Sequence, residues 1–114
     1  MTGELIVNRL FSERNTPEII IHLFMFGPKT RTEIYEAISR NPRMPIKIDM
    51  LLSYRILKEH PRGRGQYTTL ELTALGERFA RMLCDQERLL GGSVDAYRWG
   101  CVMSKLEEFD SAAT

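Results

Sequence analysis

A basic, glycine-rich turn that leads into a strand and then a helix is the feature that most constrains the fold of this chain. Residues 61–65 read Pro-Arg-Gly-Arg-Gly, and the glycines can adopt positive φ without steric cost. The residues from Gln66 to Leu72 include β-branched and aromatic types, which predicts a strand. Thr73 can cap a long helix that reaches Leu90. The stretch therefore predicts the second strand of a hairpin and the helix that follows it.

The remainder of the chain is mostly helical in pattern. Helical spacing of apolar residues, with capping and breaking signals, predicts helices over Glu4–Glu13, Thr16–Phe26, Thr30–Asn41, Pro45–Tyr54 and from Ser93 to a frayed tail at Asp110–Thr114. Gly27-Pro28 ends one of them, and Thr30 with Glu33 forms a capping box. Residues 55–60 can extend a helix or form a strand, and the strand is favoured because residues 66–72 need a partner. The expected class is mainly α with a small β-hairpin (α+β).

Length and composition indicate one soluble domain. A chain of 114 residues, 43% hydrophobic and 27% charged, fits a single globular domain over residues 1–114. The longest apolar run is too short to cross a bilayer, and no secretory signal pattern opens the chain. Two cysteines do not form a disulfide framework, so a reduced cytoplasmic location is expected.

The charge of the chain is unevenly distributed. Its net charge is only +1, but residues 40–64 hold seven basic and two acidic side chains, which is 7 − 2 = +5. The other residues hold nine basic and thirteen acidic side chains, which is −4. Such asymmetry favours a face that binds an anionic partner, and the alternative is a solvated loop that is basic by composition alone.

The phrase Leu-Thr-Ala-Leu-Gly at residues 72–76, preceded by the Gly/Arg turn, resembles the strand-to-helix junction of winged helix-turn-helix regulators of the MarR, PadR and HxlR groups. The resemblance spans roughly residues 16–90 and implies a winged-helix core there, with helical extensions at 1–15 and 93–114. It also implies a transcriptional regulator whose third helix enters the major groove of double-stranded DNA. The hairpin would lie along the backbone or in the minor groove.

The residue types near these elements agree with DNA binding. Two arginines on a glycine turn can approach phosphates or a narrow minor groove, and side chains on the third helix can reach base edges. The start of the helix after Thr30 favours a phosphate. The predicted DNA-binding residues are Thr30, Arg31, Arg43, Lys47, Tyr54, Lys58, Arg62 and Arg64.

The terminal helices carry apolar seams beyond the needs of a winged-helix core. Burial against a second copy would produce a two-fold homodimer suited to a palindromic site, and the alternative is folding back on the chain's own core. The predicted dimerisation residues are Leu5, Leu10, Leu83, Leu90, Trp99, Val102, Met103, Leu106 and Phe109. A small-molecule effector is compatible with such a dimer, but no residue identifies one.

No catalytic chemistry is indicated. The sequence shows no metal-ligand spacing, phosphate loop or nucleophile motif, so neither an enzyme nor a cofactor is expected. Cys84 and Cys101 are expected to be plain thiols rather than redox sensors. The second functional hypothesis is a winged-helix module that binds another protein and not DNA. Salt-dependent retention on duplex DNA separates the two hypotheses.

Overall fold

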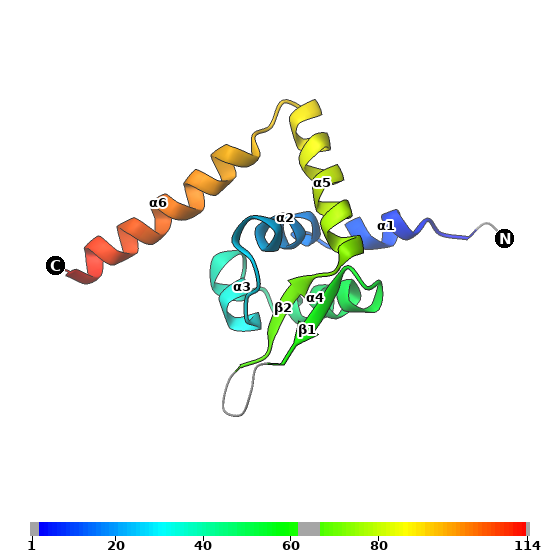
Figure 1. Ribbon diagram of the computed structural model, residues 1–114, viewed down its shortest axis with the longest axis horizontal. Coiled ribbons are helices and arrows are strands. Elements are labelled where there is room, and N and C mark those ends of the chain that lie inside the picture. Colours follow the sequence, from blue (N-terminus) through cyan, green and yellow to red (C-terminus); the bar gives the residue numbers. More distant parts are fainter. Residues whose placement is uncertain (1–2, 62–66, 114) are drawn as a thin grey trace. The chain divides into compact units, whose positions relative to one another are not determined.

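The computed structural model describes residues 3–61 and 67–113, with side chains described as far as residue 107 (Figure 1). In these ranges the chain is mainly helical with one two-stranded antiparallel hairpin, which confirms the α+β class. The elements are α1 (Ile6–Phe11), α2 (Thr16–Phe26), α3 (Arg31–Ala37), α4 (Met44–Ser53), β1 (Leu57–His60), β2 (Thr69–Leu72), α5 (Ala74–Leu89) and α6 (Val94–Ala113). The chain divides into two units, Met1–Leu83 and Cys84–Thr114, and α5 crosses the boundary.

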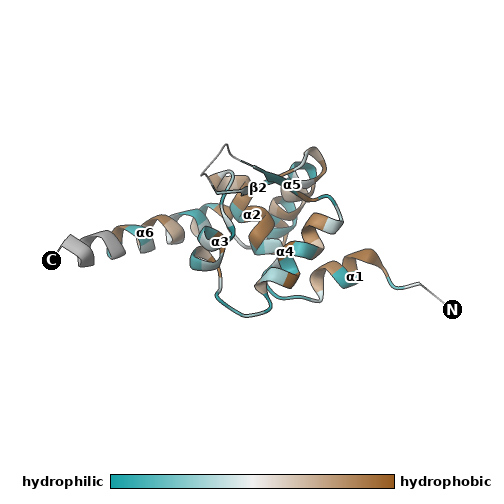
Figure 2. Ribbon diagram, turned by 90° about the horizontal axis from the view of Figure 1, so that it is seen from below, coloured by the Kyte–Doolittle hydropathy of each residue, from teal (hydrophilic) through white to brown (hydrophobic). Residues whose placement is uncertain are grey.

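The first unit is built around α2. This helix is apolar along most of its length (Figure 2), and Ile19 and Ile20 are fully buried. Residues from α1, α3, α4, both strands and α5 complete the core. Its buried members are Leu10, Ile19, Ile20, Leu23, Ile34, Met44, Ile48, Leu51, Ile56, Leu57, Leu70, Ala80 and Leu83. The short helix α1 therefore belongs to the folded core through Leu10.

The turn between α2 and α3 is attached to the hairpin. Gly27 ends α2 with φ of +80°, a conformation in which glycine carries no Cβ penalty. Lys29 then pairs with Leu70 of β2 through two backbone hydrogen bonds of 3.0 and 2.7 Å. The start of α3 is thus held against the sheet. The helix ends at Ala37, earlier than the expected Asn41, and in the loop the Ser39 hydroxyl accepts the Asn41 N–H instead.

Before the hairpin begins at Leu57, the chain turns at Arg55, whose backbone is in the left-handed region. Arg55 has φ of +60°, which costs a residue with a Cβ roughly 1–2 kcal/mol relative to right-handed backbone. The predicted strand at 55–60 is confirmed only from Leu57, because the chain turns at Arg55 before it extends. β1 and β2 pair antiparallel, with Leu57 opposite Leu72 and His60 opposite Thr69.

The junction between β2 and α5 is closed by Thr73 and Gly76. The Thr73 hydroxyl accepts the Gly76 N–H at 2.9 Å and so caps α5, as predicted, and it donates to the Arg55 carbonyl. The Thr73 N–H donates to the Ile56 carbonyl at 3.0 Å. A Cβ at Gly76 would lie only 2.1 Å from that same Ile56 oxygen. The Thr-x-x-Gly phrase therefore lets the first turn of α5 lie directly on the backbone that leads into β1.

The second unit comprises the end of α5 and the long helix α6. Gly91 follows α5 with φ of +88°, and the Ser93 hydroxyl accepts the Ala96 N–H at 3.1 Å, which confirms the predicted cap of α6. Among the described helices, none combines the length and the apolar character needed to span a membrane.

Candidate nucleic-acid interface

Arg31 connects three elements of the candidate interface. It is the first residue of α3, and its guanidinium lies 3.0 Å from Asp49 Oδ1 of α4 and 3.7 Å from Glu59 Oε1 of β1. Partial burial opposes the charge, but the hydrogen bonds and charge interactions with Asp49 and Tyr35 together outweigh it, so the pKa of Arg31 is raised. One side chain thus reaches both the exposed face of α4 and the hairpin, so these two surfaces lie on the same side of the first unit.

The exposed face of α4 differs from the one expected. The sequence predicts that Lys47 contacts DNA, but the relative exposure of this residue is only 3%, so the prediction is wrong. Lys47 falls on the buried side with Met44, Ile48 and Leu51, where it lies in the field of Glu13. The exposed residues of α4 are Pro45, Ile46, Asp49 and Ser53. The surface that α4 offers to a partner is therefore apolar and acidic.

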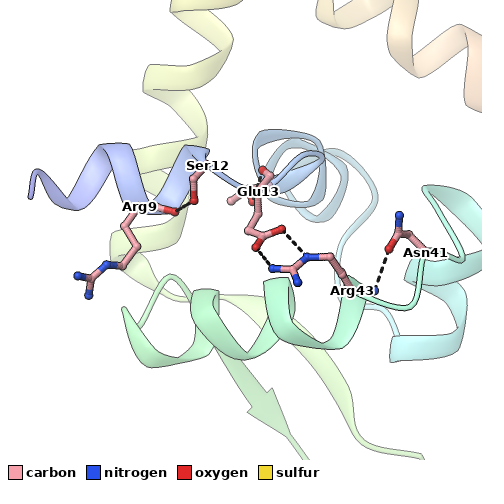
Figure 3. A network of polar contacts seen from close by, with 6 residues as sticks. Arg9, Ser12, Glu13, Asn41 and Arg43 are labelled. Atoms are coloured by element: carbon pink, nitrogen blue, oxygen red, sulfur yellow. Dashed lines mark hydrogen bonds and ion pairs between the residues drawn. The ribbon is translucent and has the colours of Figure 1, made fainter.

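Arg43 is held by a carboxylate of its own chain. Figure 3 shows its side chain reaching from the start of α4 to Glu13 in the turn between α1 and α2. Arg43 Nε donates to one Glu13 oxygen at 3.2 Å while Nη2 donates to the other, a bidentate geometry. The Arg43 N–H also bonds Asn41 Oδ1 at 2.8 Å. The guanidinium assigned to DNA is thus engaged in holding α4 to the N-terminal turn.

The negative charge of Glu13 stabilises the fold, and protonation at low pH should remove this stabilisation. Hydrogen bonds from Arg43, with the positive charges of Arg43 and Lys47, lower the pKa of Glu13 below its ordinary 4.5. A carboxyl with a lowered folded-state pKa stabilises the fold above pH 4.5, and this contribution disappears as the pH falls through the folded pKa. We expect Glu13→Gln to melt a few degrees below the wild type at pH 7, and the difference to shrink as the pH falls below 4.5. Thermal denaturation by circular dichroism between pH 3 and 7 measures this.

The control for that experiment is Glu107→Gln, which removes an exposed carboxylate from α6. Its melting temperature should follow the wild type across the series. A Glu13→Gln deficit that is equally large at pH 3 and pH 7 would mean that Glu13 acts through packing and not through its charge.

The remaining residues that were predicted to contact DNA either interact with nearby residues of the chain or lie outside the described residues. Thr30 forms the predicted capping box, since its hydroxyl accepts the Glu33 N–H at 3.2 Å and its own N–H donates to Glu33 Oε1 at 3.0 Å. Tyr54 is half-buried against the core. Lys58 is exposed and lies 3.7 Å from Glu71. The predictions for Arg62 and Arg64 fall outside the described residues.

The predicted dimerisation residues separate into two groups. Leu10 and Leu83 are 2% and 9% exposed, so both pack inside their own chain and their assignment to an interface is corrected. The others that the structure describes are exposed: Leu5, Leu90, Trp99, Val102, Met103 and Leu106. The side chain of Phe109 is outside the described part. Four of these residues follow one face of α6 at i, i+3, i+4 and i+7, an apolar stripe of the kind that packs against another element.

Among the described residues, no group of three or more His, Cys, Asp or Glu side chains is placed so that it could hold a metal ion. Cys84 is buried, and burial raises the pKa of its thiol. A raised pKa lowers the thiolate fraction, which disfavours reaction at this position.

No family model matches the sequence, and no curated protein matches it.

Proposed function

We propose that this chain is a winged helix-turn-helix regulator that binds double-stranded DNA as a homodimer. The observation that carries the proposal is the reach of Arg31 to both Asp49 of α4 and Glu59 of β1. It brings the helix after the α3–α4 loop and the strand that leads into the basic turn to one side of the fold. A helix and an arginine-bearing hairpin on one side suit a duplex, whose groove and backbone are approached together.

The electrostatics support a hairpin that makes backbone contacts. Residues 40–64 carry a formal excess of +5, and in the sequence Arg62 and Arg64 fall between the residues of β1 and those of β2. The exposed Lys58 lies 3.7 Å from Glu71, whose carboxylate is partly solvent-exposed. Exposed pairs contribute only about 0–1 kcal/mol, so a phosphate can replace this carboxylate at little cost. The phosphate contacts supply affinity that depends on salt.

The dimer is proposed from α6. Trp99 is 65% exposed, and Val102, Met103 and Leu106 continue the same apolar face. Packing this face against its copy buries side chains that are otherwise in water, at about 25 cal/mol per Å² of apolar surface. A two-fold dimer presents two hairpins and two α4 helices, which matches a palindromic DNA site.

Salt dependence tests the DNA-binding proposal. We expect the wild type to bind random duplex with an affinity that falls steeply as salt rises. Arg62→Ala with Arg64→Ala should reduce the magnitude of the slope of log K against log salt by about 2 for each protomer and so by about 4 for the dimer, because each lost phosphate contact removes about one released counterion. Fluorescence anisotropy on a labelled duplex between 50 and 300 mM salt measures the slope.

The matched control removes two arginines from α5, Arg78→Ala with Arg81→Ala, which changes the net charge equally. This variant should keep the wild-type slope more closely than the hairpin variant does. Absence of wild-type binding at the lowest salt would refute DNA binding and leave the second candidate.

The second candidate is a winged-helix module for protein partners, and one observation favours it. Every residue of α4 is described, and its exposed face holds Pro45, Ile46 and Asp49 but no basic side chain. Such a face is less suited to phosphates than to a protein surface. Under this candidate, neither the wild type nor the hairpin variant is retained on DNA.

A further inference from the structure

The exposed face of α4 holds side chains that can distinguish base pairs. Ile46 and Asp49 are three residues apart and so lie on one face of the helix. Ile46 is 51% exposed, and the Asp49 side chain is 66% exposed although it pairs with Arg31. Three residues span about 4.5 Å of helix, while stacked base pairs lie about 3.4 Å apart. The spacing of the two side chains along the helix is therefore close to the spacing of neighbouring base pairs.

The chemistry of these two groups selects particular bases. A carboxylate only accepts hydrogen bonds, and in the major groove cytosine offers the N4 amino group to an acidic side chain. An aliphatic side chain packs on the C5 methyl group of thymine. An aspartate that faces DNA is normally repelled by phosphates. At Asp49 the adjacent Arg31 guanidinium offsets that repulsion.

Arg31 also restricts the orientation of the carboxylate. Its Nη2 lies 3.0 Å from Oδ1 of Asp49, and the same guanidinium lies 3.7 Å from Glu59. The two acceptors hold Arg31 between α4 and β1. Arg31 is thus a positioning residue for Asp49, which keeps most of its side chain open to a partner.

We infer that Asp49 and Ile46 set the sequence preference of this protein, with Asp49 selecting cytosine and Ile46 selecting thymine at a neighbouring position. The inference rests on the proposed function and deepens it. It replaces Lys47, which is buried, as the residue of α4 that reads bases.

A change of preference is the test. The full-length wild type, Asp49→Ala and Asp49→Asn are each used to select bound sequences from a random duplex library. The wild type should favour cytosine at one position by about five- to tenfold, and Asp49→Ala should lose this preference while other positions keep theirs. Asp49→Asn should favour adenine there, since an amide pairs with adenine N6 and N7. Ile46→Ala should weaken only the thymine preference nearby.

Glu77→Gln is the control for loss of an exposed negative charge, and its selected sequences should equal those of the wild type. Circular dichroism verifies that each variant is folded. If the wild type selects a motif and both Asp49 variants select the same one, the assignment of Asp49 is overturned while DNA binding stands. If the wild type retains no duplex at low salt, DNA binding fails and this inference fails with it.

Discussion

Replacing Gly76 with alanine is expected to lower the free energy of unfolding by about 3 kcal/mol, a large part of the stability of a small domain. The added Cβ would lie 2.1 Å from the Ile56 carbonyl oxygen and 3.2 Å from Leu72 Cδ2. The nearer atom is backbone, so no side-chain rotation relieves the clash. Relief requires α5 to move away from the residues that lead into β1, which breaks the bonds that Thr73 makes to Arg55 and Ile56. Urea denaturation followed by circular dichroism measures the loss.

Gly100→Ala is the matched control for that substitution. Gly100 lies inside α6, and a Cβ added there meets no described atom within 4 Å. Alanine is favoured over glycine in a helix by about 1 kcal/mol, so this variant should be as stable as the wild type or more so. Equal stability of Gly76→Ala and the wild type would show that α5 does not need its close approach to Ile56.

Placing two carboxylates on the apolar face of α6 is expected to convert a dimer into a monomer. The variant Met103→Glu with Leu106→Glu alters two exposed residues whose packing against a second copy we propose. Burying unpaired charges costs several kcal/mol, which raises the dissociation constant of the dimer at least about 100-fold. Sedimentation equilibrium should report twice the 13.2 kDa chain mass for the wild type and the single chain mass for the variant.

Lys105→Glu supplies the control, because it changes the net charge by the same two units from an exposed position of α6 outside the stripe. This variant should remain dimeric. A monomeric wild type at micromolar concentration would refute the proposed dimer. If both variants were monomers, charge and not the apolar face would govern association. If both stayed dimers, the apolar face of α6 would not be the interface.

The elements of the fold were largely predictable, since local signals specify them. The capping box of Thr30 and Glu33, the caps at Thr73 and Ser93, and the break at Gly27 depend on residues only a few positions apart. Such signals operate wherever the segment lies in the fold. The turn at Arg55 was not predictable in the same way. Arg55 is not a glycine, so its left-handed backbone conformation is imposed by the structure around it and not by its own residue type.

The candidate site was less predictable, because its charges are organised by tertiary contacts. Met44, Ile48 and Leu51 mark the buried side of α4, and Lys47 follows the same phase. That periodicity was the signal that could have placed Lys47 inside and Asp49 outside. The partners of these charges, Glu13 for Arg43 and Glu59 for Arg31, come from distant parts of the chain. The net charge of residues 40–64 does not reveal that Arg40, Arg43 and Lys58 pair with carboxylates from outside that segment.

The enclosed lysine of α4 has a consequence for how this sequence can diverge. Lys47 and Arg43 both lower the pKa of Glu13, so a descendant that loses the acid at position 13 leaves two positive charges without the carboxylate that they share. It also loses the bidentate contact that joins the start of α4 to the N-terminal turn. Substitutions at positions 13, 43 and 47 should therefore occur together.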